Sequence, residues 1–323
     1  MKKTIAYRLN ILAFLLPALI LFVGILIAPI VMSVIYSFHD FKSVSASAEM
    51  NYVGFGNYIE LFSKMLVNEK GAAFTNVNYM GDALVNALIL GALSVFIQLP
   101  LALLIALKLS KGIRGERAYL SIYFMPVLIS TVIIGQLWMN IYEPDGLLNA
   151  ALNTLGIKNQ VFNWVNAHIY STKMPFKGAW TGYKETALIA AFIPILWQYV
   201  GYHMLLMYAG IKGVPADLLE AAQLDGCTEG QVNRHIVIPY IKPILKVCVI
   251  FAVTGSLKSF DLIYTLMKDT RRAELPSTLM YKLTFLNNRY GLGSAIAVVL
   301  IVLCFAFALL ISLAFRDKGE KVA

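Results

Sequence analysis

The sequence has 323 residues with a formal net charge of +9, only 14% of its residues are charged, and its mean hydropathy is +0.70. Soluble domains carry about 25% charged residues, because a folded chain must still cover its surface with polar groups. The composition therefore excludes a soluble enzyme, a disordered chain and a collagen-like chain. It predicts an all-α membrane protein that crosses the bilayer several times.

Six stretches are long and apolar enough, or nearly so, to cross a bilayer core, which needs about 20 residues as a helix. The first is not expected to be a cleavable signal peptide, because its apolar run from Ile11 to Ile35 exceeds the roughly 7–15 residues of a signal core. We expect residues 1–323 to form a single transmembrane domain. In chain order, the predicted spans cover residues 11–37, 84–108, 119–142, 186–211, 240–266 and 294–315.

The segments outside these spans alternate between short basic ones and longer, more neutral ones. With the adjoining helix ends, the basic set holds 14 Lys and Arg in about 65 residues, and it comprises residues 1–10, 108–118, 212–239 and 316–323. The other set holds 12 in about 115 residues, and it comprises residues 38–83, 143–185 and 267–293. Basic residues gather on the cytoplasmic side of membrane proteins, so both termini are predicted to face the cytoplasm. This bias explains the net charge, and we expect no nucleic-acid partner.

The third basic segment, residues 212–239, carries more signals than a connection between two spans needs. Pro215 suits the first turn of a helix, and Asp217 complements the positive end of that helix. Gly226 favours the left-handed conformation that ends a helix, and Thr228 and Gln231 have the spacing of a capping box that begins another. We therefore predict two short cytoplasmic helices that dock a partner protein, and we call residues 212–239 the docking element.

Within the docking element, Glu-Ala-Ala at residues 220–222 is followed after three residues by Gly226 and after nine more by Ile236. This register resembles the EAA loop of ABC-importer permeases, which usually has Leu before its final proline where this chain has Ile238. The Asp-Gly pair at 225–226 is typical of the carbohydrate branch of that family. The resemblance implies that the loop sits in a groove of an ATPase subunit, through Glu220, Ala221, Ala222, Asp225, Gly226, Ile236 and Pro239.

Further matches extend the resemblance over nearly the whole chain, at residues 53–58, 123–126, 138–148 and 259–264. The first of these, VGFGNY, resembles a "VGxxNY" segment of the maltose-type first permease. The family has the type I importer permease fold of six transmembrane helices. It implies a second homologous permease subunit, two ATPase subunits, an extracytoplasmic solute-binding protein and a sugar substrate. It also implies a bacterial or archaeal cytoplasmic membrane.

The sequence contains no G-x-x-x-x-G-K-[ST] pattern, so it lacks this phosphate-binding loop. We expect no catalytic residue, metal site or bound cofactor on this chain, with ATP and Mg²⁺ held by the partner ATPase. The three cysteines fit no disulfide framework and no zinc or redox motif, and we interpret them as small apolar residues: Cys227, Cys248 and Cys304.

Polar groups inside the predicted spans indicate where a substrate would pass. Lys258 and Asp261 lie three residues apart in the fifth span, a spacing that places them on one face of a helix. There they either pair with each other or line the path. Positions carried over from the family give Tyr199, Tyr202, Ser256 and Ser259 as candidate path residues, and their aromatic faces and hydroxyls suit a sugar. The amide of Gln198 suits sugar hydroxyls as well, and Asp261 is the sixth candidate if the charged pair lines the path. We interpret His203 as a packed residue rather than a proton relay.

Other functions stay open at this point. The basic run Lys268, Arg271 and Arg272 is compatible with an importer for a non-sugar or acidic solute. A membrane-embedded enzyme would need paired carboxylates, a metal-ligand cluster or a nucleophile with a base, and the predicted spans show none of these patterns. A stand-alone ion-coupled carrier would need no docking element and would be expected to contain inverted repeats.

Overall fold

The computed structural model of the chain describes residues 2–43, 49–66, 80–143, 146–155, 184–267 and 274–316. Within these ranges helices dominate, and the only strands form one short antiparallel pair. The chain divides into two compact units, which are residues 1–80 with 279–302 and residues 81–278 with 303–323.

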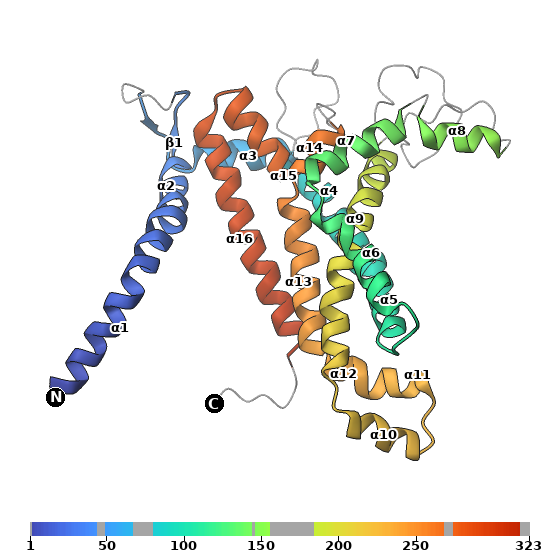
Figure 1. The fold of residues 1–323 in the computed structure, drawn as a ribbon. Coiled ribbons are helices and arrows are strands. Elements are labelled where there is room, and N and C mark those ends of the chain that lie inside the picture. Colours follow the sequence, from blue (N-terminus) through green and yellow to red (C-terminus); the bar gives the residue numbers. More distant parts are fainter. Residues whose placement is uncertain are drawn as a thin grey trace. The chain divides into compact units, whose positions relative to one another are not determined.

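The first unit contains a long N-terminal helical run, the strand pair and one amphipathic helix (Figure 1). Its elements are α1 (Lys2–Leu21), η1 (Phe22–Ile27), α2 (Ala28–Tyr36), β1 (His39–Asp40), β2 (Asn51–Tyr52), α3 (Gly56–Leu66) and η4 (Lys282–Leu286). Two further helices contribute residues to both units, α15 (Pro276–Tyr281) and α16 (Tyr290–Ala314).

The second unit contains most of the remaining helices. They are α4 (Met80–Leu93), η2 (Ser94–Gln98), α5 (Leu99–Leu109), α6 (Glu116–Leu128), α7 (Thr131–Tyr142), α8 (Leu147–Thr154), α9 (Lys184–Lys212), α10 (Ala216–Leu224), α11 (Glu229–Val232), η3 (Asn233–Val237), α12 (Ile238–Tyr240), α13 (Lys242–Lys258) and α14 (Asp261–Met267). Helix α9 packs against α5, α6 and α13, with α10 to α12 at one end of the unit and α7 and α14 at the other (Figure 1).

Four helical runs are long and apolar enough to cross a membrane, namely Ala13–Tyr36, Met80–Leu109, Ala187–Lys212 and Tyr290–Ala314. They coincide with the first, second, fourth and sixth predicted spans. Two bent pairs pass the same test together, Glu116–Leu128 with Thr131–Ala151 and Glu229–Tyr240 with Lys242–Lys258, with bends of 94° and 71°. The described residues therefore provide four spans, or up to six if each bent pair counts as one.

The third predicted span, residues 119–142, is not one straight helix. It breaks between α6 and α7, where Ile129 and Ser130 both have extended ψ angles, 139° and 132°. Pro126 lies three residues before the break and lacks the N–H that would continue the helical hydrogen bonding, so it weakens the end of α6. The direction of the chain therefore changes inside the segment that the hydropathy pattern presents as continuous.

The fifth predicted span, residues 240–266, is also interrupted. Helix α13 ends at Lys258, Ser259 is extended, and α14 begins at Asp261. The Ser277 hydroxyl donates to the Ser259 carbonyl oxygen, which the helix leaves without an intrahelical partner at this break. The prediction that Lys258 and Asp261 share one face of a continuous helix is therefore wrong.

The VGFGNY segment, residues 53–58, organises the first unit. Asn57 is buried, and its side-chain amide donates to the carbonyl oxygens of Ser37 (2.8 Å) and His39 (2.9 Å). The Tyr58 hydroxyl donates to Ser37 Oγ at 2.8 Å. Gly54 has a φ of +55°, which glycine adopts without strain. These bonds tie α3 to the chain that leaves α2, which gives the motif a structural role.

The core of the second unit lies between α5, α9 and α13 with η3 at its edge, and it is built from Leu, Met, Ile, Val, Ala and Cys side chains. Helix α6 approaches α9 so closely that a Cβ on Gly201 would overlap the Tyr123 carbonyl oxygen. A Cβ on Gly210 would likewise overlap the side chain of Ile244 on α13. Helix α9 is therefore packed tightly between its neighbours. A close-packed interior transmits the displacement of one helix to the next rather than absorbing it.

Candidate functional site

The docking element forms the two short helices that the sequence predicts. Helix α10 ends in a Schellman motif, in which Cys227 N–H donates to the Ala222 carbonyl (3.0 Å) and Gly226 N–H donates to the Gln223 carbonyl (3.1 Å). Gly226 occupies the left-handed position of this motif with a φ of +74°. The prediction that this glycine ends the first helix is confirmed.

The second helix begins at the predicted capping box. The Thr228 backbone N–H donates to Gln231 Oε1 at 2.7 Å, and α11 starts at the next residue. The chain then continues through η3 and α12, and Ile241 separates α12 from α13. The docking element is therefore compact and ordered by bonds between residues that are close in sequence.

The predicted coupling residues lie on several surfaces of this element. On α10, Ala222 is buried against the chain itself, whereas Glu220 and Ala221 are exposed. The remaining coupling residues are exposed or half-buried, namely Asp225, Gly226, Ile236 and Pro239. Two leucines of α10 are also exposed, Leu218 and, at 88%, Leu224. Exposed apolar side chains of this kind are typical of a surface that contacts another protein.

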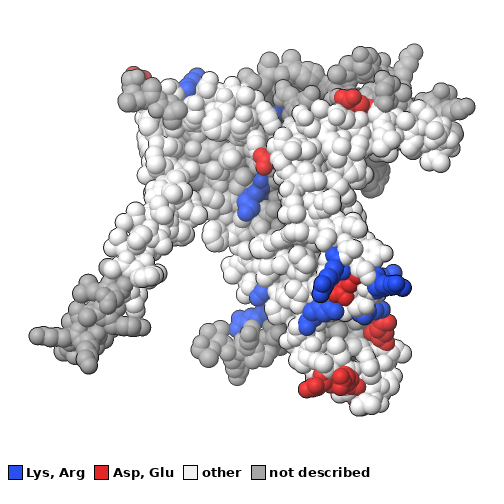
Figure 2. Space-filling model, in the orientation of Figure 1, with Lys and Arg blue, Asp and Glu red and all other residues white. Residues whose placement is uncertain are grey.

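The segment between α5 and α6 meets the docking element at the same end of the second unit. Lys111 forms an ion pair with Glu229 at the start of α11, and Glu116 lies 3.6 Å from Lys212 at the end of α9. Figure 2 shows Lys, Arg, Asp and Glu side chains gathered at this end. Two basic segments that the sequence places on one side of the membrane, residues 108–118 and 212–239, therefore lie together.

A cavity of about 490 Å³ lies within the second unit, inside the range of typical small-molecule sites. Five of the six predicted path residues line it, namely Tyr199, Tyr202, Ser256, Ser259 and Asp261. The sixth, Gln198, does not. Its side chain is buried, and its amide oxygen has no hydrogen-bond partner among the residues that the structure describes.

Hydroxyl groups line the cavity from α13. The Ser256 hydroxyl donates to the Ala252 carbonyl (2.8 Å), and the Thr254 hydroxyl donates to the Ile250 carbonyl (2.7 Å). Both hydroxyl protons take part in hydrogen bonds within the helix. The two hydroxyl oxygens therefore offer acceptor lone pairs to the cavity rather than donor protons. They suit a ligand that donates hydrogen bonds.

Aromatic rings form another part of the wall. The Tyr202 ring centroid lies 5.4 Å from that of His203 and 6.3 Å from that of Phe251, and all three residues line the cavity. Such rings present apolar faces with polar edges. Together with the hydroxyls of α13, they combine the two surfaces that a sugar requires, one for its C–H face and one for its hydroxyls.

The two charged residues of the fifth predicted span, Lys258 and Asp261, also line the cavity. Lys258 ends α13 and Asp261 begins α14, and both side chains are exposed rather than packed away. No ion pair joins them among the contacts found for the described residues. The two residues therefore line the cavity without an ion pair between them in the described part of the chain, and their role in a substrate path stays a prediction.

The sequence interpretation missed part of the lining. Ser94 and Gln98 on η2 and Thr131 on α7 line the cavity, and so does His203, which was interpreted only as a packed residue. His203 is 4% exposed, and its Nδ1 atom has no hydrogen-bond partner in the described part of the chain. Ser94 and Gln98 interrupt an apolar run four residues apart, a signal that could have drawn attention to them. The basic run at residues 268–272 lies outside the described residues.

Comparison with known proteins adds a family. A family model described as "Binding-protein-dependent transport system inner membrane component" matches residues 98–319. The chain is 32% identical over 319 residues to a probable ABC transporter permease protein of Pyrococcus horikoshii, covering 96% of this chain and 97% of that protein. It is 28% identical to the diacetylchitobiose uptake system permease protein NgcF of Streptomyces coelicolor, covering 95% and 82% of the two chains.

Two further similarities agree with these. The trehalose/maltose transport system permease protein MalF of Thermococcus litoralis is 27% identical, over 91% of this chain and 90% of that protein. Among solved structures, a chain of a bacterial ABC transporter involved in the import of the acidic polysaccharide alginate superposes with a TM-score of 0.76 at 23% identity. That match covers 98% of this chain and 99% of the other, and it shows a shared fold.

Proposed function

The chain belongs to the family of inner-membrane components of binding-protein-dependent transport systems, and we propose that it is one of two permease subunits of an ATP-driven sugar importer. The observation that carries the choice of substrate is the cavity, which combines aromatic faces with hydroxyl and amide groups. The systems named for two relatives, for diacetylchitobiose uptake and for trehalose/maltose transport, support the same choice.

In this proposal the cavity forms this subunit's half of the translocation path. Tyr199 and Tyr202 pack against the sugar ring, because aromatic faces match the apolar C–H faces of pyranoses. Ser256 accepts hydrogen bonds from sugar hydroxyls, and Gln98 supplies an amide that both donates and accepts. A sugar bound in this way loses few hydrogen bonds when it leaves water, which keeps the barrier to transport low.

The docking element couples this path to the energy source. We propose that the exposed face of α10 fits a groove of one ATPase subunit, with Ala221 and Gly226 permitting close approach. The second ATPase would meet the second, homologous permease in the same way. ATP and Mg²⁺ bind to those ATPase subunits, and this chain supplies the mechanical connection.

The membrane arrangement follows from the same proposal. The protein lies in the cytoplasmic membrane with six spans, in which the bent pairs act as the third and fifth, and both termini face the cytoplasm. The docking element then lies on the cytoplasmic side, and the opposite end of the second unit faces an extracytoplasmic solute-binding protein that delivers the sugar.

An acidic solute is the second candidate. Lys258 lines the cavity, and its ammonium group would favour a carboxylate on the substrate. Asp261 lines the same cavity and opposes this preference, so a neutral sugar stays the first choice. Uptake of a neutral disaccharide and of a uronic-acid disaccharide by the same vesicles would separate the two.

The test is purification followed by transport. The tagged chain is extracted gently from its native membrane, and co-purifying proteins are identified by mass spectrometry. A second permease and a P-loop ATPase are expected, and the complex in vesicles should accumulate sugar only with ATP and the binding protein. A chain that repeatedly purifies alone, in detergents that preserve other complexes, would contradict the coupling role.

A further inference from the structure

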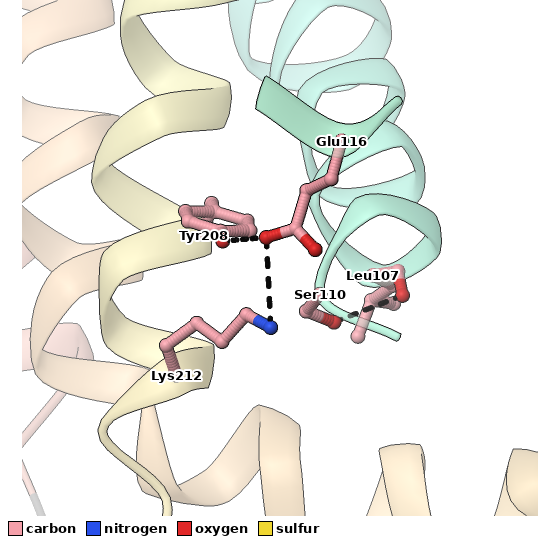
Figure 3. A network of polar contacts seen from close by, with 5 residues as sticks. All are labelled: Leu107, Ser110, Glu116, Tyr208 and Lys212. Carbon is pink, nitrogen blue, oxygen red and sulfur yellow. Dashed lines mark hydrogen bonds and ion pairs between the residues drawn. The ribbon is translucent and has the colours of Figure 1, made fainter. Parts of the chain in front are cut away.

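The carboxylate of Glu116 connects α6 and the turn before it to the last turns of α9. This contact lies at the end of the second unit that carries the docking element. The Tyr208 hydroxyl donates to Glu116 Oε1, and the Lys212 ammonium lies 3.6 Å from the same oxygen (Figure 3). Tyr208 and Lys212 are four residues apart, on one face of the last turns of α9. The Lys212 Nζ atom also lies 5.6 Å from the centre of the Tyr208 ring. One half-buried carboxylate therefore holds two side chains of α9 together.

The turn that carries Glu116 has little freedom. Gly112 and Gly115 adopt left-handed conformations, with φ angles of +73° and +86°. The Ser110 hydroxyl donates to the Leu107 carbonyl at 3.0 Å, as Figure 3 shows, and Glu116 N–H donates to the Ile113 carbonyl at 3.0 Å. Glu116 lies in the first turn of α6, where a negative charge complements the helix dipole. Its position is therefore set by the backbone of this turn.

The same turn reaches the docking element from a second direction. Lys111 forms an ion pair with Glu229, in the first turn of α11. Helix α9 ends at Lys212, and α10 begins only four residues later at Ala216. The turn between α5 and α6, together with Glu116 that follows it, thus contacts the docking element at α11 and at Lys212, the residue where α9 ends and the docking element begins.

The far end of α6 and the middle of α9 line the cavity. Val127 of α6 and Tyr199 of α9 are both lining residues, and Tyr199 lies nine residues, or about 14 Å, before Tyr208 along α9. Between the two sites, a Cβ on Gly201 would overlap the Tyr123 carbonyl oxygen, so α6 and α9 pack in close contact there. A displacement at Glu116 is therefore carried along α6 and α9 to the cavity wall.

We infer that Glu116 is a positioning residue for energy coupling: it holds α6, the end of α9 and, through its turn, the docking element as one body. This inference rests on the proposed function, because it concerns how movement of the docking element reaches the sugar. Without the Glu116 contacts, the docking element still follows the ATPases, but the cavity-lining helices follow it less completely. ATP is then hydrolysed with less sugar transported.

The test measures sugar transported per ATP hydrolysed by the complete complex in vesicles. Glu116→Ala removes both contacts and should lower this ratio by at least about fivefold, the low end of coupling between distant sites. Tyr208→Phe removes the hydroxyl alone and should lower it less. The double variant should be no worse than Glu116→Ala, because the two changes share one contact. The KM for the sugar-loaded binding protein should not change.

Two variants keep the result interpretable. Glu116→Gln retains an acceptor for Tyr208 and should keep most of the coupling, whereas Arg117→Gln changes the neighbouring charge and should behave as wild type. Should Glu116→Ala fail to assemble, Tyr208→Phe and Glu116→Gln decide the question.

A ratio for Glu116→Ala within about twofold of wild type would overturn the inference, as would an equal loss in Arg117→Gln. Failure of the wild-type complex to transport any sugar would instead refute the proposed function.

Discussion

The docking element and the cavity belong to the same unit of the chain but are held together in different ways. The docking element is a continuous segment, and its two helices are ended and begun by bonds between residues three to five positions apart. The cavity is assembled from η2, α6, α7, α9, α13 and α14, so its shape depends on packing between distant segments. A segment that moves as a rigid body can be stabilised by residues close in sequence. A site that surrounds a ligand needs residues from several distant segments.

The largest effect is expected where the cavity walls meet most closely. Gly201→Ala places a methyl group on the Tyr123 carbonyl, a backbone atom that cannot rotate away. Overpacking costs about 1–3 kcal/mol, and we expect the upper end here because α6 itself must shift. The variant should melt earlier in detergent and lose transport.

Gly255→Ala is the matched control for this change. Gly255 also lies on a helix that lines the cavity, but a Cβ there meets no atom within 4 Å. Its melting temperature should be no lower than that of the wild type, because alanine favours the helix more than glycine does. Equal melting temperatures for Gly201→Ala and the wild type would show that the cavity walls are not held by this contact.

The next largest effect separates the docking element from the rest of the unit. Gly226→Ala forces a side chain into the left-handed conformation, at a cost of about 1–2 kcal/mol. This cost distorts the end of α10, so transport per ATP should fall while the melting temperature of the whole chain hardly changes. Gly230→Ala, in the same element, meets no atom within 4 Å and should transport normally. A fall in both variants would point to general sensitivity of this element.

The contrast between the two regions also explains what could be predicted from the sequence. The signals for the docking element are Pro215, Gly226 and Thr228, and each acts on its immediate neighbours, so the sequence alone locates both helices. The cavity residues on α9 and α13 were found through a family resemblance, and Ser94 and Gln98 were missed. Their position in the wall depends on helices more than 90 residues further along the chain.

The hydropathy pattern does not show the helix breaks, for a related reason. Hydropathy presents residues 240–266 as one span, but the break after Lys258 is stabilised by the hydroxyl of Ser277, eighteen residues after Ser259. The bend after Pro126 similarly needs a neighbouring helix to accept the change of direction, since proline within an apolar segment often only kinks it. Four of the six spans lack such interruptions, and the sequence predicts their positions well.

A smaller effect tests the missed part of the cavity. Gln98→Leu keeps the side-chain size but removes an amide, and losing one hydrogen bond costs about 0.5–1.5 kcal/mol. The concentration of sugar-loaded binding protein for half-maximal uptake should therefore rise by about 2–10-fold. Co-purification of the ATPase should not change. Gln136→Leu makes the same substitution at an exposed position of α7 outside the cavity, and it should leave uptake unaltered.

The smallest effect concerns the start of α11. Thr228 caps this helix through its capping box with Gln231, and replacing such a cap with alanine costs about 1 kcal/mol. Because the cap acts only on its own turn, the loss should appear as roughly fivefold faster hydrogen exchange of the α11 amides and nowhere else. Thr228→Ser retains the hydroxyl and should exchange at the wild-type rate. Faster hydrogen exchange of the Tyr202 and His203 amides as well would show that the docking element and the cavity wall open as one cooperative unit. The local character assigned to the docking element would then be wrong.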